Sequence, residues 1–453
     1  MQVDQKAKRE KWGSKTGFIL AAAGSAIGLG NIWRFPYVLG ENGGFAFLLI
    51  YLICVVMIGL PIMGAEMVIG RGSKRNPFGA FKALLPGSAW WVVGVIGILT
   101  GFLILSYYNV VAGWTLYYLF KSVTGVISGF TSPDAAEAMY EGFVGNSGMV
   151  VLFQFLFTLL GILVVSQGVK GGIERYSKIL MPALFVLLVL LIVRSVTLPG
   201  SSAGLAFLFT PDFSKLNMDV ILMAMGQAFY SLSLGMGVMI TYGSYLDRKT
   251  NIMSSTATVA GLDAGIAVLA GVAIFPAVFA MGMDPADGFG LTFQVLPMVF
   301  AQLPGSHMIG DVMSTLFFLL LTIAAITSSI SLLEVLVSFA TDELRWTRSR
   351  ATIIMASIAF LLGVPSALSF GIWKDVEFFG LGFFGIADYI TANIMLPIGG
   401  ILIAIFAGWV WGKAVKEEML IGSGQEKLYK VWLWGVRIVA PIAVGTILVF
   451  NFI

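Results

Sequence analysis

The sequence predicts an all-α membrane protein, and three observations support this fold class. Hydrophobic residues make up 58% of the 453 residues and charged residues only 11%, against about 25% charged in a soluble domain. Apolar runs long enough to cross a bilayer, which takes about 20 residues, recur along the whole chain. Two of these runs are interrupted near their middle by glycine and polar residues. Most of the chain is therefore expected to face lipid or other buried helices.

Apolar runs of about 18 residues or more indicate membrane spans, and the sequence contains eleven of them. They are expected near 14–38, 43–70, 88–120, 148–167, 178–198, 219–245, 255–282, 308–340, 351–370, 378–410 and 431–452. The charged segment 1–13 has no signal-peptide cleavage site, so it is expected to be a cytoplasmic tail.

The positions of lysine and arginine test this count. With the N-terminus inside, most of the 27 basic residues fall in cytoplasmic segments, whereas the outward loops near 131–147 and 283–306 carry only acidic charges. This bias predicts an odd number of spans, with the N-terminus cytoplasmic and the C-terminus extracellular. The loop 283–306 is long and half apolar, and we expect either a lid over the extracellular mouth or an ordinary structured loop.

The chain has one cysteine, Cys54, and one histidine, His307. These numbers exclude a disulfide scaffold and a metal centre built from histidine and cysteine. An enzyme is disfavoured, because the sequence lacks a nucleophile elbow and His307 lies near an outer loop.

The two interrupted spans carry the main functional prediction. Span 1 is broken at GSAIGLGN, residues 24–31, and span 6 at SLSLGMG, residues 231–237. Unpaired backbone is costly in lipid, so a mid-membrane break is expected only where it lines a cavity. Breaks at matching positions of two halves indicate an inverted repeat with a binding site between the halves. The predicted repeats are spans 1–5 (residues 14–198) and 6–10 (residues 219–410), followed by an eleventh helix, 431–453. Tight helix packing is the alternative explanation for such glycines.

Each break offers two binding groups. Unwound carbonyls can ligate a small cation, and a half-helix N-terminus presents free N–H groups to a carboxylate. In span 8, four residues have the spacing of one helical face: Ala324, Thr327, Ser328 and Ser331. Their hydroxyls could complete a cation site, or could bond to their own helix.

Five motifs, in this order, resemble the neurotransmitter:sodium symporter family: GLGNIWRFPYVLGENGGFAF, SYYNVVAGWTL, SLSLGMGVMITYGSYL, AITSSISLLE and DELRWTR. The resemblance covers nearly the whole chain and implies a leucine-transporter-like fold. It implies a sodium-coupled symporter, not an enzyme, that imports hydrophobic L-amino acids by alternating access across the plasma (inner) membrane of a bacterium.

The resemblance also implies ligand sets. One sodium ion is expected at Ala26, Asn31, Ser231 and Asp263, and a second at Gly24, Ile27, Ala324, Thr327 and Ser328. The amino acid is expected to contact Ala26, Leu29, Gly30, Ile104, Tyr108, Phe229, Tyr230, Ser231, Ser233, Met236 and Leu332.

Three departures from the family pattern refine the prediction. Monoamine carriers have an aspartate where this chain has Gly28, so the substrate is expected to bring its own carboxylate. Chloride-dependent members have asparagine and serine where this chain has Asp263 and Ala267. A fixed carboxylate can replace the charge of chloride, so transport is expected to need two sodium ions and no chloride. The chain ends after span 11 where many members have twelve spans, which leaves the oligomeric state, a monomer included, open.

The resemblance places a gate on each side of the site. Arg34 and Asp388 are expected to close the extracellular side. Arg9, Trp12, Tyr245 and Asp342 are expected to close the cytoplasmic side. Within the spans, Glu66 is expected to support the break of span 6, while the protonation of Glu66 and Glu334 is left open.

A further feature lies at the cytoplasmic start of span 5. Gly172 and Pro182 bracket nine residues where the helix could unwind, because proline removes one backbone donor. We expect this unwinding to open a water path to the second sodium ion; an ordinary helix boundary is the alternative.

Two other functions remain as alternatives. An ion channel would need a continuous polar pore, and a sodium-coupled betaine- or GABA-like osmolyte carrier would differ in pocket width around Ser233 and Met236. The expected partners are the substrate, sodium and the lipid bilayer, without nucleic acid.

Overall fold

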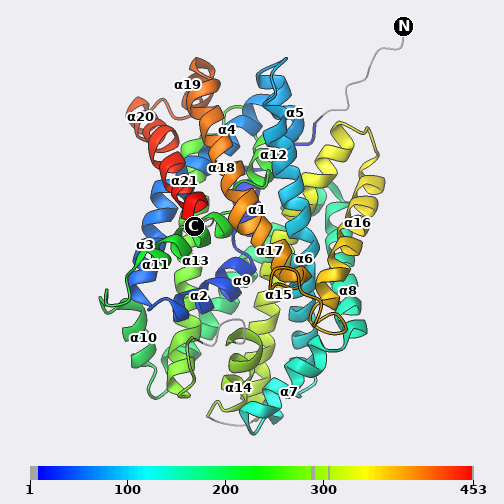
Figure 1. Cartoon of the computed structure of the whole chain (residues 1–453), viewed down its shortest axis with the longest axis vertical. Coiled ribbons are helices and arrows are strands. Elements are labelled where there is room, and N and C mark those ends of the chain that lie inside the picture. Colours follow the sequence, from blue (N-terminus) through cyan, green and yellow to red (C-terminus); the bar gives the residue numbers. More distant parts are fainter. Residues whose placement is uncertain (1–8, 287–290, 305–306, 451–453) are drawn as a thin grey trace.

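The computed structural model describes residues 9–286, 291–304 and 307–450. Regular structure in these ranges is helical, apart from one isolated bridge between Phe378 and Leu381. The helices form an elongated bundle with the N-terminal segment at one end and α14 (Leu296–Ala301) at the other (Figure 1). The predicted all-α class is confirmed for the described residues.

The first part of the chain contains both long helices and short π-helical or 3-10 turns, the latter labelled η. In order these are α1 (Lys15–Ala26), η1 (Gly30–Arg34), α2 (Phe35–Glu41), α3 (Phe45–Cys54), η2 (Val55–Gly59), α4 (Leu60–Ser73), α5 (Pro77–Leu84), α6 (Trp91–Val123), η3 (Ile127–Gly129), α7 (Pro133–Val144), α8 (Ser147–Val165), η4 (Val169–Glu174), α9 (Arg175–Val196) and α10 (Ser202–Phe209).

The second part begins at the second interrupted segment. Its elements are α11 (Met218–Ser231), α12 (Val238–Ser244), α13 (Ile252–Ala280), η5 (Leu291–Val295), α14, α15 (His307–Asp342), α16 (Arg348–Leu368), α17 (Phe383–Tyr389), η6 (Ile390–Met395), α18 (Leu396–Ile405), η7 (Phe406–Val410), α19 (Lys413–Leu420), α20 (Glu426–Trp434), η8 (Gly435–Val439) and α21 (Ala440–Phe450).

Nine helical stretches of the described residues are long and apolar enough to cross a membrane, or ten if the α1–α2 pair, bent by 48°, is one span. Helices α11 and α12 are each too short to cross a bilayer core of about 30 Å at 1.5 Å per residue. The predicted count of eleven therefore depends on joining them.

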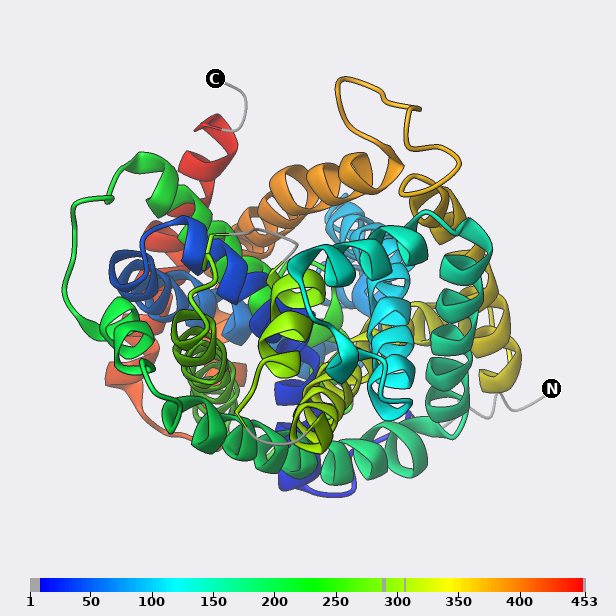
Figure 2. The ribbon, with the colours of Figure 1, turned by 90° about the horizontal axis from the view of Figure 1, so that it is seen from below.

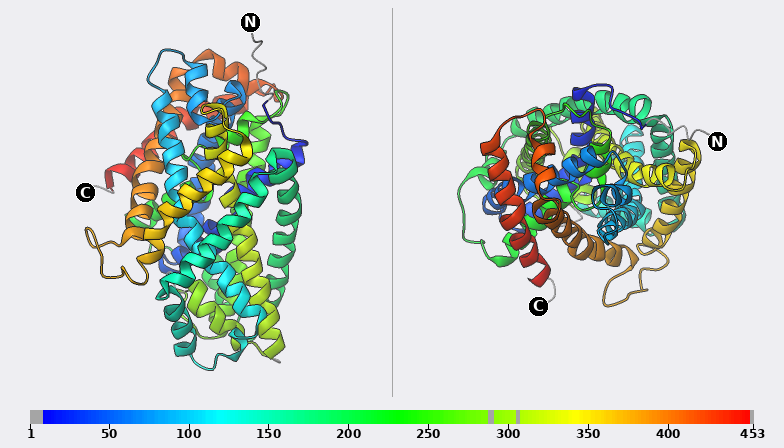
Figure 3. Two further views of the ribbon diagram at one scale, coloured as in Figure 1. Left: turned by 90° about the vertical axis from the view of Figure 1, so that its right-hand side faces the viewer. Right: turned by 90° about the horizontal axis from the view of Figure 1, so that it is seen from above.

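Three predicted span starts differ from the structure by five residues or more, and one of these is the start of the last span, which lies at Glu426 and not at 431. The span expected at 178–198 starts at Val169, because η4 continues the helix through charged residues that an apolar window excludes. The span expected at 378–410 starts at Phe383, because residues 371–382 form a loop that projects from the side of the bundle (Figure 3). Of the predicted tail 1–13, residues 1–8 lie outside the described ranges.

Burial separates central from peripheral helices. In the most apolar part of α15, 83% of residues are buried, against 33% in the η4–α9 stretch and 28% in the stretch from α20 to α21. Helix α15 is therefore a core element. Figure 2, viewed along the long axis, shows α9 at the outer edge of the bundle, which leaves one of its faces for lipid.

Local chemistry explains the first interruption. Helix α1 ends at Ala26, and Ile27 is extended, with φ −74° and ψ 92°. The Asn31 side chain then accepts a hydrogen bond from the Gly28 N–H, 3.2 Å away. A side-chain amide thus satisfies a backbone donor that the interrupted helix leaves without a partner.

The second interruption spans residues 232–237, between α11 and α12. Gly235 and Gly237 have φ of 77° and 75°, a region that glycine enters without steric cost. The Gly235 N–H donates to Glu66 Oε1 at 2.7 Å, and Glu66 is fully buried. The expectation that Glu66 supports this break is confirmed.

We predict that Glu66→Leu lowers the thermal stability of the detergent-solubilised protein. It leaves the buried Gly235 N–H without an acceptor, which costs about 1–3 kcal/mol. The melting temperature of purified protein, followed by intrinsic fluorescence, measures this change. Glu66→Gln keeps an oxygen acceptor and is the matched control, so equal melting temperatures for the two variants would contradict the assigned role.

The loop expected as a lid folds back onto the end of the bundle. Phe293 of η5 is fully buried and packs against Trp33, Trp114 and Tyr118, with ring centroids 6.5, 5.5 and 5.1 Å away. Residues 287–290 and 305–306 of this loop lie outside the described ranges. The aromatic packing of the described part favours the lid over an ordinary surface loop.

Candidate functional site

A buried polar network connects the two interrupted segments with α13. Asn31 Nδ2 donates to Asp263 Oδ1 at 2.8 Å and to Ser231 Oγ at 3.1 Å. Ser231 Oγ donates to Asp263 Oδ2 at 2.8 Å. Tyr51 of α3 completes the network, with its hydroxyl 3.3 Å from both Ser231 Oγ and Asp263 Oδ2. Three residues that the resemblance predicts for one sodium ion thus lie in contact.

The charge of this network is unbalanced. Asp263 is fully buried and its hydrogen-bond donors are neutral. Among the described residues, no lysine or arginine forms a salt bridge with it. A buried carboxylate without a cation is costly. The carboxylate and hydroxyl oxygens of this network therefore fit a small hard cation. The Asn31 side chain turns its amide nitrogen to the network and its amide oxygen to the Gly28 N–H.

A second group of oxygens lies between α1 and α15. Ser328 Oγ is 2.9 Å from the Ser25 carbonyl oxygen and 3.4 Å from that of Gly24. Thr327 Oγ1 lies 3.0 Å from the Ala324 carbonyl oxygen of its own helix. Four of the five residues predicted for the second ion thus form two oxygen pairs. The fifth, Ile27, has no hydrogen bond to this group within the described part of the chain; its N–H donates to Ala23 at 2.7 Å.

A small central cavity lies between the two interruptions. Its volume is about 30 Å³, and it is lined by Ser25, Ala26, Gly28, Leu29, Gly30, Ile104, Tyr108, Tyr230, Ser233, Met236, Ser328 and Leu332. Every residue predicted to contact substrate is present except Phe229 and Ser231. Ser231 belongs to the Asp263 network instead, while the Phe229 ring packs against Gly400. This volume holds one or two water molecules, so side chains must separate before an amino acid can enter.

Polar groups around this cavity suit a zwitterion. The Leu29 N–H at the break points to the Tyr108 hydroxyl, 3.3 Å away. On the opposite side, Ser233 Oγ donates to the Ser25 carbonyl at 3.0 Å. Ile104, Met236 and Leu332 supply an apolar wall. The arrangement provides donors for a carboxylate, carbonyls for an ammonium group and an apolar space for a side chain.

The predicted extracellular gate is assembled without a direct ion pair. Arg34 and Asp388 line one cavity of about 10 Å³ that shares Leu29, Tyr108 and Tyr230 with the central cavity, but no salt bridge within 4.0 Å joins them in the described residues. Asp388 accepts from the Tyr107 hydroxyl at 3.2 Å, and the Arg34 guanidinium lies over the Tyr230 ring, 4.7 Å from its centroid.

The predicted cytoplasmic gate is closed by direct contacts. Arg9 pairs with Asp342, donates to Ser244 Oγ at 2.6 Å and stacks on Tyr245. Trp12 Nε1 donates to the Tyr242 carbonyl at 3.0 Å.

A second layer lies beside this gate. The Tyr245 hydroxyl donates to Glu334 at 2.6 Å, and Arg348 pairs with the same carboxylate at 2.5 Å. The sequence does not identify a partner for Glu334, and in the structure its carboxylate is the partner of these two residues.

The segment expected to unwind is helical in this conformation. It is π-helical up to Glu174 and α-helical from Arg175, with Pro182 inside α9. A Cβ atom at Gly172 would lie 2.1 Å from the Val164 carbonyl oxygen, so this glycine is also required for close packing. Unwinding remains a prediction.

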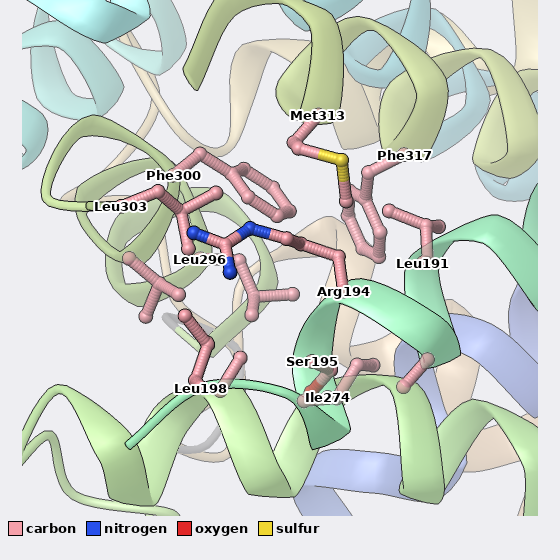
Figure 4. A pocket seen from close by; sticks show the side chains of 13 residues that line it. Leu191, Arg194, Ser195, Leu198, Ile274, Leu296, Phe300, Leu303, Met313 and Phe317 are labelled. Atoms are coloured by element: carbon pink, nitrogen blue, oxygen red, sulfur yellow. The ribbon is translucent and has the colours of Figure 1, made fainter. Parts of the chain in front are cut away.

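Another cavity lies near the opposite end of the bundle from the N-terminus. It is bounded mainly by apolar side chains of α9, α13, α14 and α15, with Ser195 and Arg194 as its polar groups. Figure 4 shows Arg194 extending across it towards Phe300 and Leu303, and Arg194 donates to the Pro304 carbonyl at 3.1 Å. It shares no lining residue with the central cavity.

Sequence reasoning missed several groups of the central site. Tyr51 carries the only hydroxyl in the apolar stretch 45–65, a signal that could have marked it. Gln227 donates to the Gly30 carbonyl at 2.7 Å, and Ser25 Oγ lies 2.6 Å from Ser331 Oγ. Gln227 is buried on α11 just before the second break. A polar side chain in an apolar span needs a hydrogen-bond partner, and this signal could have marked Gln227.

Comparisons with known proteins agree with this architecture. The model of the sodium:neurotransmitter symporter family matches residues 9–132 and 135–453. An uncharacterised sodium-dependent transporter of Bacillus subtilis is 41% identical over 96% of both chains. The crystal structure of MhsT in complex with L-phenylalanine has a TM-score of 0.91 and 46% identity, covering 98% of this chain and 99% of that one. The human sodium- and chloride-dependent neutral and basic amino acid transporter B(0+) is 28% identical over 95% of this chain and 77% of its own.

Proposed function

This chain belongs to the sodium:neurotransmitter symporter family, and from that premise we propose that it imports hydrophobic L-amino acids with two sodium ions and without chloride. It is a sodium-dependent symporter and not an enzyme. The observation that carries the finer proposal is the fully buried Asp263 carboxylate, which is bonded to Asn31 and Ser231 of the two interrupted segments and whose partners in the described structure are all neutral.

The two oxygen groups are assigned to two sodium ions. Asn31, Ser231 and Asp263 with the Ala26 carbonyl hold the first, next to the substrate carboxylate. Gly24, Ile27, Ala324, Thr327 and Ser328 hold the second. Supporting this assignment, Ser328 and Thr327 already lie beside Gly24, with a Cβ at that glycine 3.2 Å from Thr327 Cβ.

An amino acid is favoured over a decarboxylated amine. A Cβ atom at Gly28 would lie 2.3 Å from Ser328 Oγ and 3.0 Å from the Tyr108 hydroxyl, so an aspartate there would displace both groups. Without that aspartate, the carboxylate that joins Asp263 near the first sodium ion comes from the substrate. The apolar wall and the phenylalanine bound to MhsT support a hydrophobic side chain.

Chloride independence rests on the same region of α13. Asp263 and Ala267, four residues apart, are both fully buried. The carboxylate supplies a fixed negative charge beside the first ion, and Ala267 offers no hydroxyl to hold a halide.

The transport cycle alternates the two gates. We infer eleven spans, with α11 and α12 as one broken span, the N-terminus cytoplasmic and the C-terminus extracellular. The Arg34–Asp388 layer closes over substrate on one side, and the contacts of Arg9, Trp12, Tyr245 and Asp342 break on the other. A potential of 100 mV contributes about 2.3 kcal/mol per charge and a tenfold gradient about 1.4 kcal/mol, so two ions supply roughly 7 kcal/mol for accumulation.

We predict that Pro182→Ala slows release of the second sodium ion to the cytoplasm. Alanine restores a backbone donor at this position and stabilises the wound helix. The rate of sodium release to the cytoplasmic side, measured by stopped-flow fluorescence, should fall severalfold. The equilibrium affinity for substrate should stay within twofold of wild type. Gly171→Ala adds a methyl group into open space on the same segment and serves as the control. Unchanged release in Pro182→Ala would refute the unwinding.

Uptake by proteoliposomes tests the proposed function. Accumulation of radiolabelled L-phenylalanine should require an inward sodium gradient, rise with an inside-negative potential and persist when gluconate replaces chloride. Saturable uptake without unitary currents separates a carrier from an ion channel. Betaine or GABA uptake exceeding that of phenylalanine would favour an osmolyte carrier instead.

A further inference from the structure

A basic hollow on the outside of the bundle points to a bound lipid. A cavity of about 440 Å³, far larger than the central one, is lined by Gly13, Lys170, Glu174, Arg175, Lys178 and Ile179. It lies where the N-terminal segment meets η4 and the start of α9. Lys170, Arg175 and Lys178 are all exposed, and the charged groups of Lys170 and Arg175 are available to a ligand in this hollow.

The charges in the hollow favour an anion. Glu174 is the only acidic lining residue, and it is buried and already engaged: it accepts from the Gly13 N–H at 2.5 Å, from Ser14 Oγ at 2.9 Å and from Lys178 Nζ at 2.6 Å. No salt bridge connects Lys170 or Arg175 to a carboxylate within the described residues. These two exposed cations are therefore free to pair with an anion.

An apolar stripe starts at the rim of the same hollow. Ile179 is 59% exposed, and further along α9 Val186, Leu190 and Val193 are 56%, 48% and 56% exposed. Their positions 7, 11 and 14 residues after Ile179 place them on one helical face. Because α9 lies at the outer edge of the bundle (Figures 2 and 3), this face borders the acyl chains of the bilayer.

We propose that this hollow binds the headgroup of an anionic phospholipid, with one acyl chain along the Ile179–Val193 face. Basic pockets between membrane helices on the cytoplasmic side are suited to such headgroups. The inference rests on the proposed orientation, which places these residues at the inner leaflet. A free phosphate would use the basic groups but not the apolar face, and the adjoining stripe therefore favours the lipid.

Native mass spectrometry of the full-length protein in detergent tests this site. Phosphatidylglycerol should be retained by wild type, whereas phosphatidylcholine should not. The triple variant Lys170→Gln, Arg175→Gln, Lys178→Gln should bind phosphatidylglycerol at least tenfold more weakly, since each basic side chain near a membrane surface contributes about fivefold. Inorganic phosphate should not displace the lipid.

A matched variant controls for net charge. Lys413→Gln, Lys427→Gln, Lys430→Gln removes the same charge from exposed positions elsewhere and should bind lipid as wild type does. Equal loss in the two variants, equal retention of phosphatidylcholine, or displacement by inorganic phosphate would each overturn the proposal. The melting temperature of the same preparations, followed by intrinsic fluorescence, reports folding. The lipid readout needs neither sodium nor substrate, so failure of this site and failure of the proposed function are distinguishable.

Discussion

Asp263→Asn is expected to abolish chloride-independent uptake of L-phenylalanine. The amide keeps the size of the side chain and one oxygen that can accept from Asn31, while its NH2 group turns the bond with Ser231 Oγ into one that Ser231 accepts. It removes the charge that is proposed to face the first sodium ion. At an effective dielectric constant of about 20, a unit charge pair 4 Å apart interacts by about 4 kcal/mol. Sodium affinity should therefore fall by about 100-fold or more. Sodium titration of phenylalanine binding in gluconate buffer measures this loss.

A second substitution separates the charge from other effects. Adding Ala267→Ser to Asp263→Asn recreates the asparagine and serine of chloride-dependent relatives. Chloride should therefore restore phenylalanine binding in the double variant, whereas binding by wild type should not change when chloride is added. Wild-type uptake by Asp263→Asn in gluconate would contradict both the sodium site and the basis for chloride independence.

Tyr108→Phe is expected to weaken binding of L-phenylalanine by about 10- to 100-fold. The Tyr108 hydroxyl lies 3.3 Å from the Leu29 N–H at the edge of the central cavity, where the substrate carboxylate is proposed to bind. A hydrogen bond to a charged group is worth about 1.5–3 kcal/mol. The dissociation constant at saturating sodium measures the effect.

Tyr118→Phe is the matched control for this loss. Tyr118 is also on α6 and fully buried, but its hydroxyl has no hydrogen-bond partner in the described structure. Its removal should leave phenylalanine affinity near that of wild type. If the two variants bind phenylalanine equally well, Tyr108 does not contact the carboxylate.

The sequence was most informative where composition alone dictates structure. Apolar runs identified most of the helices, because lipid requires continuous apolar surface. Glycine and polar residues inside two runs marked the interruptions at Ala26–Gly30 and after Ser231. Both breaks use side-chain oxygens as substitute hydrogen-bond partners, and the second also uses positive-φ glycines. Glu66 was correctly linked to the second break because an isolated carboxylate in a span must find donors.

Contacts between distant elements were less predictable. Tyr51 joins the Asp263 network from α3. Hydropathy does not predict which residue the hydroxyl of a tyrosine in an apolar run will contact. Arg34 and Asp388 were expected to pair, yet each has an aromatic neighbour in this conformation; opposite charges at one depth do not fix side-chain geometry. The start of the fifth span was misplaced because Lys170 and Glu174 are charged although their segment is helical.

The central claim is that two interrupted helices enclose a sodium-dependent site for a hydrophobic amino acid. Equilibrium binding of all twenty amino acids to the purified protein, with sodium and with sodium replaced by potassium, tests it most directly. The account predicts saturable binding of phenylalanine and other hydrophobic L-amino acids in sodium. It predicts at least 100-fold weaker binding in potassium, because the Asp263 carboxylate then lacks its sodium counter-ion. Equal affinity in the two salts, or binding restricted to polar amino acids, would contradict it.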